Sequence, residues 1–334
     1  MPIHYLVLLF SQYWLTCIAE NNPLILQCQN KEQMFNTQIY TTMNNSNNIL
    51  VNDQNNVLNQ NTVENIDWDG TLWRDRVFSH PERTITIGTS CSGIGAPEQA
   101  LRQLGLNSKI LFAGDIDPNV KKSYIANYDI TEEQWHNDMF KFDATPFKGK
   151  LTLFVSGICC QTFSKAGGLA GVKDKKRGCL YTAFSRIVRE CEPEVWIMEN
   201  VENMLNSNKG SDWKIIKEEL DTLGYDIHYQ VLNAKSYGVP QSRARLFVIG
   251  FKRPTDFLYP RPIKQEKVIN DILEDKGEGL RQLTPREALR LQGFGEDFKI
   301  AVSDTYAYKQ AGNSIAVPVL KALYQQMDIT KYGF

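Results

Sequence analysis

The segment "TITIGTSCSGIGAPEQALRQLG", residues 84–105, decides the fold class of this chain. Its apolar start predicts a buried strand, and its second half predicts a helix, with Pro97 in the first turn and Gly105 at the end. Gly93 and Gly95 lie between the two, where the backbone must turn sharply and can approach a ligand closely. The pattern fits a nucleotide or nucleoside site, and glycines that serve only a tight turn are the alternative.

The same alternation of strand and helix continues along the chain. Further strands are expected at 109–115, 151–157, 194–200, 226–233 and 245–251, with helices at 118–128, 180–191 and 212–225. Such alternation predicts an α/β fold with a mixed, mostly parallel sheet and helices on both faces, in which the last two strands form a closing pair. Ligands of these sheets bind at the carboxyl ends of the strands.

Composition excludes some functions. The chain has 334 residues, 42% of them hydrophobic, and a formal net charge of −1, so any polyanion would have to bind a local basic surface. Its seven cysteines form no CxxC pair and no zinc-ligand spacing, so no metal is expected. An odd number of cysteines is consistent with reduced thiols and an intracellular location, in the cytoplasm or the nucleus.

The N-terminal part differs from the rest. Residues 5–19 are apolar, but no Lys or Arg precedes them, and polar residues interrupt them. The run is therefore a poor signal peptide and a poor membrane span. A targeting segment, an upstream extension and a helix packed on the body remain open. Asn and Gln then dominate, so residues 1–65 are expected to be a disordered extension.

Acidic residues follow the second predicted strand, in "GDID" at 114–117. A carboxylate at this place commonly binds ribose hydroxyls. The glycine spacing of the first turn is not GxGxxG, which argues against a dinucleotide cofactor.

The third clear strand leads into "SGICCQTFS", residues 156–164. A cysteine on a turn at a strand end can be exposed and can face backbone N–H groups that favour the thiolate. The basic, glycine-rich residues 165–178 follow, either as a flap that closes over a substrate or as a solvated loop.

Charged residues also mark the later strand ends. Glu199 ends an apolar strand, where burial should raise its pKa and suit it to share a proton, unless it only caps a helix or forms a salt bridge. Arg243 and Arg245 are two residues apart, so on a strand they point to one face and could bind phosphate or a base carbonyl. A paired surface strand is the alternative.

Taken together, these stretches resemble the DNA (cytosine-5) methyltransferase family, over residues 84–326. The motifs that carry the resemblance are "SGIGAPEQAL", "GDID", "CQTFS", "RGCLYTAFSRIV", "MENV", "YGVPQSRARLFVIG", "LTPREALRLQGF" and "QAGNSIAVPVL". No single motif would suffice, but the set occurs in the order of the family.

The resemblance implies an enzyme that uses S-adenosylmethionine on a Rossmann-like sheet. The two glycines would line the methionine end, Asp115 would bind the ribose and Ile116 would pack on the adenine. Asp138 would hold the adenine amino group. The cofactor residues implied are Gly93, Gly95, Asp115, Ile116, Asp138, Met139, Leu180, Asn313, Ser314 and Val317.

The resemblance also assigns the reaction. The nucleophile is the cysteine before the glutamine, hence Cys160, with Gln161 beside it. Glu199 would bind N3 and the amine of a flipped-out cytosine, Arg245 would help to hold the base, and Arg243 would hold the loop or a phosphate. The residues implied in DNA contact are Ser164, Lys165, Lys175, Lys176 and Arg177.

Two departures from the family pattern keep alternatives open. Cys159 stands where the family has proline, which should loosen the turn of the nucleophile. The target-recognition segment, residues 254–282, is short for a folded module; it would divide a catalytic domain of residues 66–253 and 283–334. A monomeric DNA methyltransferase is expected; the alternatives are a degenerate relative that binds cofactor or DNA without methylating, and an RNA cytosine methyltransferase.

Overall fold

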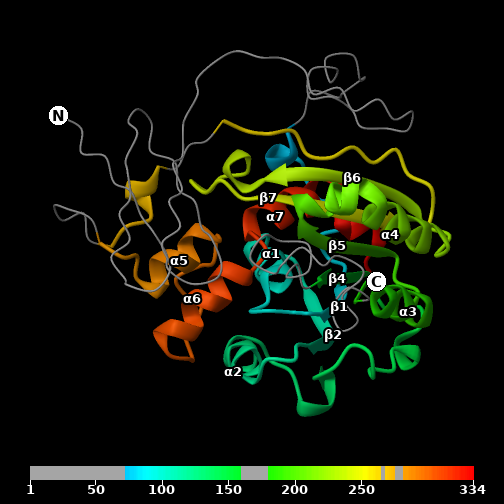
Figure 1. The fold of residues 1–334 in the computed structure, drawn as a ribbon, viewed down its shortest axis with the longest axis horizontal. Helices are drawn as coiled ribbons and strands as arrows, with labels where there is room; N and C mark the ends of the chain where they lie inside the picture. Colours follow the sequence, from blue (N-terminus) through cyan, green and yellow to red (C-terminus); the bar gives the residue numbers. More distant parts are fainter. Residues whose placement is uncertain (1–71, 159–179, 265–267, 275–280) are drawn as a thin grey trace. The chain divides into compact units, whose positions relative to one another are not determined.

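The computed structural model describes residues 72–158, 180–264, 268–274 and 281–334. Within them, one seven-stranded sheet has the order β3-β2-β1-β4-β5-β7-β6 (Figure 1). The strands are β1 Ile85–Ser90, β2 Ser108–Gly114, β3 Trp135–His136, β4 Leu153–Gly157, β5 Val195–Val201, β6 Asp226–Asn233 and β7 Ala244–Phe251. The expected fold class is confirmed, and β3 is the strand that the sequence did not predict.

The order of the strands creates a crevice at the carboxyl end of β1. This strand pairs in parallel with β2 on one side and with β4 on the other. After β1 the chain adds β2 on one side of it and later adds β4 on the other side. Sheets of this type bind ligands at the point where the strand order reverses in this way.

The last two strands bring the amino end of β7 to the same edge. β7 is antiparallel to both β5 and β6, and Arg245 pairs in register with Val201 at the end of β5. Both predicted arginines thus lie at the edge where the parallel strands end.

Helices cover both faces of the sheet. On one face, α1 and α7 pack on apolar residues of β1, β4, β5 and β7; on the other, α3 and α4 pack on β4, β5 and β7. The helices are α1 Ala96–Gln103, α2 Pro118–Asn127, α3 Leu180–Cys191, α4 Ser211–Asp221, α5 Pro285–Leu291, α6 Asp304–Asn313 and α7 Val317–Gln326. Short 3-10 turns occur at Trp73–Asp75, Glu132–Gln134, Thr145–Phe147, Glu202–Leu205, Ser207–Gly210, Ala234–Ser236, Ile269–Asp271 and Ile329–Tyr332.

The C-terminal residues join the start of the sheet. The backbone N–H of Thr84 donates to the carbonyl of Phe334 at 2.9 Å, and the N–H of Phe334 donates back at 3.1 Å. Before this return, α7 lies against α1, and the junction of α6 and α7 lies next to the turn that follows β1.

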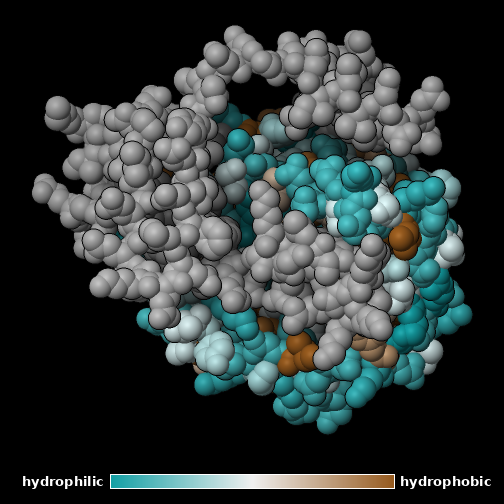
Figure 2. Space-filling view, in the orientation of Figure 1, coloured by the Kyte–Doolittle hydropathy of each residue, from teal (hydrophilic) through white to brown (hydrophobic). Residues whose placement is uncertain are grey.

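The described surface in Figure 2 is mostly hydrophilic, with apolar residues scattered over it. Two exposed large apolar side chains follow strands of the sheet: Ile116 comes after β2 and is 82% exposed, and Phe140 comes after β3 and is 43% exposed. Among the described helices, none has the length and apolar character needed to cross a membrane.

Candidate active site

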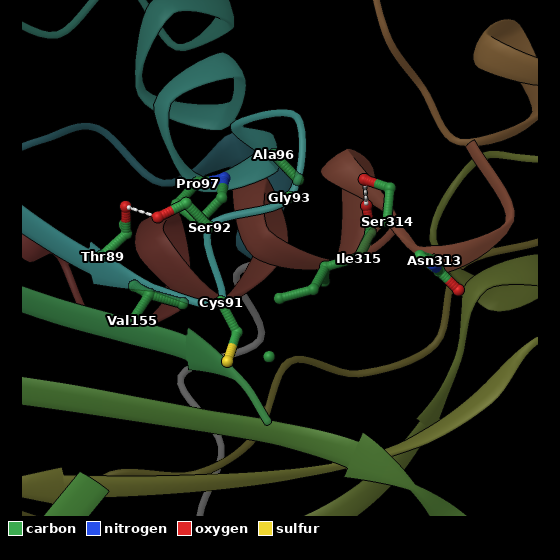
Figure 3. Close-up of a pocket in the computed structure, with 11 residues that line it drawn as sticks. Thr89, Cys91, Ser92, Gly93, Ala96, Pro97, Val155, Asn313, Ser314 and Ile315 are labelled. Carbon is green, nitrogen blue, oxygen red and sulfur yellow. Dashed lines mark hydrogen bonds between the residues drawn. The ribbon is translucent and has the colours of Figure 1, made fainter. Parts of the chain in front are cut away.

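A pocket opens at the carboxyl ends of β1 and β4, against the junction of α6 and α7 (Figure 3). The empty space in and in front of it is about 340 Å³, which includes open solvent at its mouth. The residues that line it are Thr89, Cys91, Ser92, Gly93, Ala96, Pro97, Val155, Gly157, Asn313, Ser314 and Ile315.

The two predicted glycines have different roles in this pocket. Both adopt the left-handed region, with φ of 53° at Gly93 and 79° at Gly95. A side chain at Gly93 would meet open space, whereas a Cβ at Gly95 would come within 2.5 Å of the Tyr128 ring. Gly93 therefore leaves room toward the pocket, and Gly95 permits close packing of α1 on α2.

Ser92 ties this turn to the end of β2. Its hydroxyl accepts a hydrogen bond from the N–H of Gly114 at 2.8 Å and lies 3.0 Å from the carbonyl of the same residue. The Ser92 N–H donates to that carbonyl as well, at 2.9 Å. The turn after β1 and the acidic segment after β2 are thus held together as one unit.

Asp115 stands where the resemblance places the ribose ligand. Its carboxylate accepts hydrogen bonds from the N–H of Gly93 at 3.2 Å and from the N–H of Asp117 at 3.1 Å. Burial raises its pKa, and these donors act in the opposite direction. Ile116 follows directly, and its exposed side chain offers an apolar surface on which an aromatic ligand could pack.

Asp117 completes this edge by capping α2, accepting from the N–H of Asn119 at 2.9 Å. Burial alone would raise its pKa, but Lys309, 3.0 Å away, and Asn119 lower it overall. Asp117 is therefore a structural acid, whereas Asp115 is the acid beside the glycine turn.

Three predicted cofactor residues lie differently from the expectation. The side chains of Met139 and Val317 are buried in the core, at 5% and 0% exposure, so a contact with a ligand would have to use their backbone. Leu180, at the start of α3, packs partly buried against the core on the α3 side. None of the three is among the residues lining the pocket.

Asp138 is partly exposed and already accepts a hydrogen bond from the N–H of Phe140 at 2.9 Å. Asn313 and Ser314 do line the pocket, from the end of α6. The structure therefore brings together the glycine turn and the α6–α7 junction, with the acid of β2 hydrogen-bonded to the turn.

Glu199 lies next to this pocket. Its side chain is on β5, and a Cβ built on Gly157, a lining residue, would be 3.6 Å from its Oε2. Glu199 is 7% exposed, and burial raises its pKa while the charges of Arg245 and Arg243 act against that rise. Arg245 Nε lies 3.4 Å from Glu199 Oε1. The expected carboxyl and guanidinium are thus neighbours.

The side chain of Arg243, which the resemblance assigned to the loop or a phosphate, is buried at 7% exposure. Its Nη2 donates to the carbonyls of Gly312 at 3.0 Å and Ser314 at 2.8 Å. Buried carbonyls of an irregular junction need such donors, so Arg243 supports the α6–α7 junction that lines the pocket.

The sequence reasoning missed several lining residues, above all Thr89, Cys91 and Ile315. Cys91 has a φ of 50°, which is unusual for a residue other than glycine. Gly93 and Gly95 indicated the turn from the sequence. The position of this turn could have predicted that the other residues between β1 and α1 also line the pocket.

Several predicted residues lie outside the described part of the chain. These are Cys160, Gln161, Ser164, Lys165, Lys175, Lys176 and Arg177. The last described residue before them, Ile158, is buried, and its carbonyl accepts from Asn200 Nδ2 at 3.3 Å.

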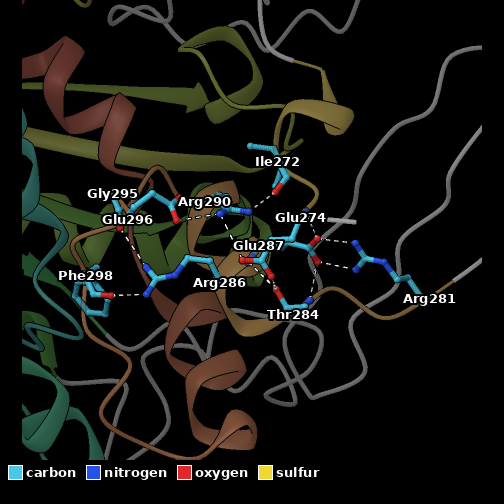
Figure 4. A network of polar contacts seen from close by, with 10 residues as sticks. All are labelled: Ile272, Glu274, Arg281, Thr284, Arg286, Glu287, Arg290, Gly295, Glu296 and Phe298. Carbon is cyan, nitrogen blue, oxygen red and sulfur yellow. Dashed lines mark hydrogen bonds and ion pairs between the residues drawn. The ribbon is translucent and has the colours of Figure 1, made fainter. Parts of the chain in front are cut away.

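The end of the segment 254–282 is anchored by a polar network on α5 (Figure 4). Arg281 makes two hydrogen bonds to the carboxylate of Glu287, at 2.6 and 2.7 Å. Burial alone would raise the pKa of Glu287, but Arg281 and the N–H groups of Thr284 and Glu274 lower it to about 2. This buried carboxylate stays ionised and fixes the start of α5.

Comparison with known proteins identifies the family of this chain. The model of the family described as C-5 cytosine-specific DNA methylase matches residues 86–278 and 264–328. The type II methyltransferase M.SsoII of Shigella sonnei is 31% identical, over 72% of this chain and 79% of the relative. M1.ScrFI of Lactococcus lactis subsp. cremoris is also 31% identical, over 71% and 76%.

This chain belongs to the C-5 cytosine-specific DNA methylase family. The resemblance read from its motifs is confirmed. The solved methyltransferase EhMeth of Entamoeba histolytica superposes with a TM-score of 0.63 at 16% identity, covering 74% of this chain and 98% of the other, which supports the fold.

Membership of this methylase family implies S-adenosylmethionine as the methyl donor, and the residues at the pocket and beside it fit such a group. A Cβ at Gly93 would enter open space, Asp115 offers a carboxylate to hydroxyl groups and Ile116 offers an exposed apolar face. Among the residues that the structure describes, no group of three or more His, Cys, Asp or Glu side chains could hold a metal ion.

Proposed function

We propose that this chain is a DNA (cytosine-5) methyltransferase that acts through a covalent adduct between Cys160 and C6 of a flipped-out cytosine. The observation that carries the proposal is the position of Glu199, a buried carboxyl beside both Arg245 and a lining residue of the cofactor pocket. The type II methyltransferases it matches support DNA as the substrate.

Glu199 acts on the pyrimidine ring. Because burial raises its pKa, the carboxyl can donate or share a proton at N3 and bind the exocyclic amine as the thiolate adds. Arg245 orients this carboxyl and helps to hold the base. A base inside a stacked duplex could not reach these groups, so the cytosine must leave the helix.

Cys160 makes C5 nucleophilic. Addition of its thiolate to C6 forms a C–S bond and pushes electron density to C5, which can then take a methyl group. Bound S-adenosylmethionine supplies that electrophilic methyl. Loss of the C5 proton to a base then expels the thiolate and restores the aromatic ring.

Cofactor residues of this chain hold the donor in place. We assign the methionine end to Gly93 and the α6–α7 junction, the ribose to Asp115 and the adenine to Ile116 and the Asp138 region. Ser164, Lys165, Lys175, Lys176 and Arg177 are assigned to DNA contact on their sequence alone.

One observation favours a second candidate, a relative that binds cofactor without methylating. Cys159 stands where the family has proline, which removes a φ constraint next to the nucleophile. Transfer of tritiated methyl groups to DNA and to transfer RNA, with Cys160→Ser and Cys159→Ser beside the parent, separates the candidates.

Label in DNA that only Cys160→Ser abolishes is the expected result. Cofactor binding without transfer to either polymer would instead establish the degenerate relative. Label in RNA alone would contradict DNA as the substrate.

A further inference from the structure

A buried acid lies directly behind the cofactor pocket and has no part in the chemistry above. Glu98, in the first turn of α1, is 4% exposed. Its Oε1 accepts hydrogen bonds from the hydroxyl of Tyr124 at 2.6 Å and from the hydroxyl of Thr89 at 3.3 Å. Its Oε2 has no hydrogen-bond partner among the described residues.

Hydroxyl groups connect this acid to the pocket. Thr89 and Ser92 both line the pocket, and their hydroxyl oxygens are 2.7 Å apart (Figure 3). Ser92 in turn contacts the N–H and carbonyl of Gly114, just before Asp115. A continuous chain of hydrogen bonds therefore runs from the Glu98 carboxyl to both cofactor loops.

The charge of Glu98 determines the direction of these hydrogen bonds. An ionised carboxylate can only accept, so the Thr89 hydroxyl must donate to it and the Ser92 hydroxyl can donate to Thr89. A neutral carboxyl with its proton on Oε1 would instead donate to the Thr89 hydroxyl, and Thr89 could then donate to Ser92, whose hydroxyl can donate to the carbonyl of Gly114. A change in the protonation state of Glu98 can thus change the hydroxyl orientations on the pocket wall.

The surroundings of Glu98 move its ionisation into the range of physiological pH. The titratable groups that influence it or its partners are Tyr124 and Tyr128 on the α2 side, Tyr324 on α7, and the surface pair Arg102 and Asp297. The tyrosines are neutral at physiological pH, because burial and the nearby acid raise their pKa values. Burial raises the pKa of Glu98 itself to about 7, with hydrogen bonds from Tyr124 and Thr89 opposing the rise.

We propose that Glu98 is a positioning residue of the cofactor pocket, and that its ionisation strengthens binding of the sulfonium cofactor. This rests on the proposed function only in taking S-adenosylmethionine as the ligand. Glu98 is already buried, so a ligand would add little desolvation. Only the Thr89 hydroxyl separates the carboxyl from the pocket, so a sulfonium bound in the pocket would stabilise the carboxylate. Because such coupling is reciprocal, the ionised carboxylate in turn strengthens binding of the sulfonium cofactor.

The test measures affinity by isothermal titration calorimetry between pH 6 and pH 8, with S-adenosylmethionine and with S-adenosylhomocysteine, which lacks the sulfonium charge. The full chain is compared with Glu98→Gln and with Glu132→Gln, a control at an exposed acid paired with Lys121. The amino group of the ligand titrates equally with all three proteins. A difference in the pH dependence of affinity between the proteins is therefore caused by the substituted acid.

Between pH 6 and pH 8, the affinity for S-adenosylmethionine should increase in the parent and in Glu132→Gln. This increase should exceed the increase in Glu98→Gln by roughly threefold to tenfold, because a cation near a buried carboxyl favours its ionised form. The excess should be smaller with S-adenosylhomocysteine. In case Glu98→Gln does not fold, Tyr124→Phe removes a donor to the carboxylate and should move the rise to higher pH.

Identical pH dependence in the parent and Glu98→Gln, or in the parent and a folded Tyr124→Phe, would overturn the proposal while leaving the methyltransferase assignment intact. Absence of binding of either ligand at every pH would overturn the cofactor assignment and this proposal together.

Discussion

At the scale of single residues, the two arginines near the site illustrate how similar sequence signals acquire separate roles. They are two positions apart, and the sequence predicted that both would point to one face of a strand. In the structure Arg245 is beside Glu199, whereas Arg243 binds the carbonyls of Gly312 and Ser314. Position relative to the sheet edge, which depends on the register of β7, separates them.

Substitution of these arginines by alanine should have different consequences. Arg243→Ala leaves two buried carbonyls without their donor, at a cost of roughly 1–3 kcal/mol per group, and should weaken cofactor binding as well as stability. Arg245→Ala should lower the rate of methyl transfer with little change in cofactor affinity. Calorimetric binding, thermal unfolding and single-turnover transfer distinguish the two; equal cofactor affinity in both variants would refute the division of roles.

At the scale of elements, the turn between β1 and α1 carries the cofactor side of the site. Its two glycines share a left-handed backbone but face different surroundings, open space at Gly93 and the Tyr128 ring at Gly95. A side chain at either position would therefore strain the left-handed backbone. Only at Gly95 would it also clash with a neighbouring side chain.

Gly93→Ala should therefore cost about 1–2 kcal/mol of stability through left-handed strain, and it should impair cofactor binding because its methyl enters the space next to the pocket. Gly95→Ala should destabilise the protein further, since its Cβ cannot coexist with the Tyr128 ring in its present position. Urea unfolding measures the loss of stability in both variants. A Gly95→Ala protein as stable as Gly93→Ala would show that α1 and α2 can separate freely.

The network on α5 predicts an acid-sensitive element. The folded-state pKa of Glu287 is about 2, below the ordinary value of 4.5. Its contribution to stability is present above pH 4.5 and is lost as the pH falls toward 2. The stability difference between the parent and Glu287→Gln should therefore shrink over that interval in urea titrations, and a constant difference would contradict the ionised pair with Arg281.

Sequence patterns predicted the main elements well because each has a strong local signal. Buried strands such as β4 are continuous apolar runs, and α3 has a clear helical period with an apolar face. β3 has only two residues, Trp135 and His136, so no periodicity could reveal it. The neighbouring Met139 and the distant Val317 were assigned by motif position, which cannot tell a side chain in the core from one in the pocket.

At the scale of the whole molecule, the site combines segments far apart in the chain. The lining residues come from the turn after β1, the end of β4 and the α6–α7 junction, and Glu199 adds the end of β5. The parallel sheet brings the strand ends to one edge, and the packing of α7 against α1 brings the α6–α7 junction there. Local sequence signals identify each segment, but only the topology unites them.

The central claim is that a methyl group reaches cytosine C5 through a bond between this enzyme and C6 of the base. The most direct measurement is incubation of the full chain with S-adenosylmethionine and DNA that contains 5-fluorocytosine, which cannot lose a proton from C5. We predict a denaturation-resistant protein–DNA adduct that maps to Cys160 by peptide mass spectrometry and is absent from Cys160→Ser. Methylation of ordinary DNA by a preparation that forms no such adduct would contradict the account.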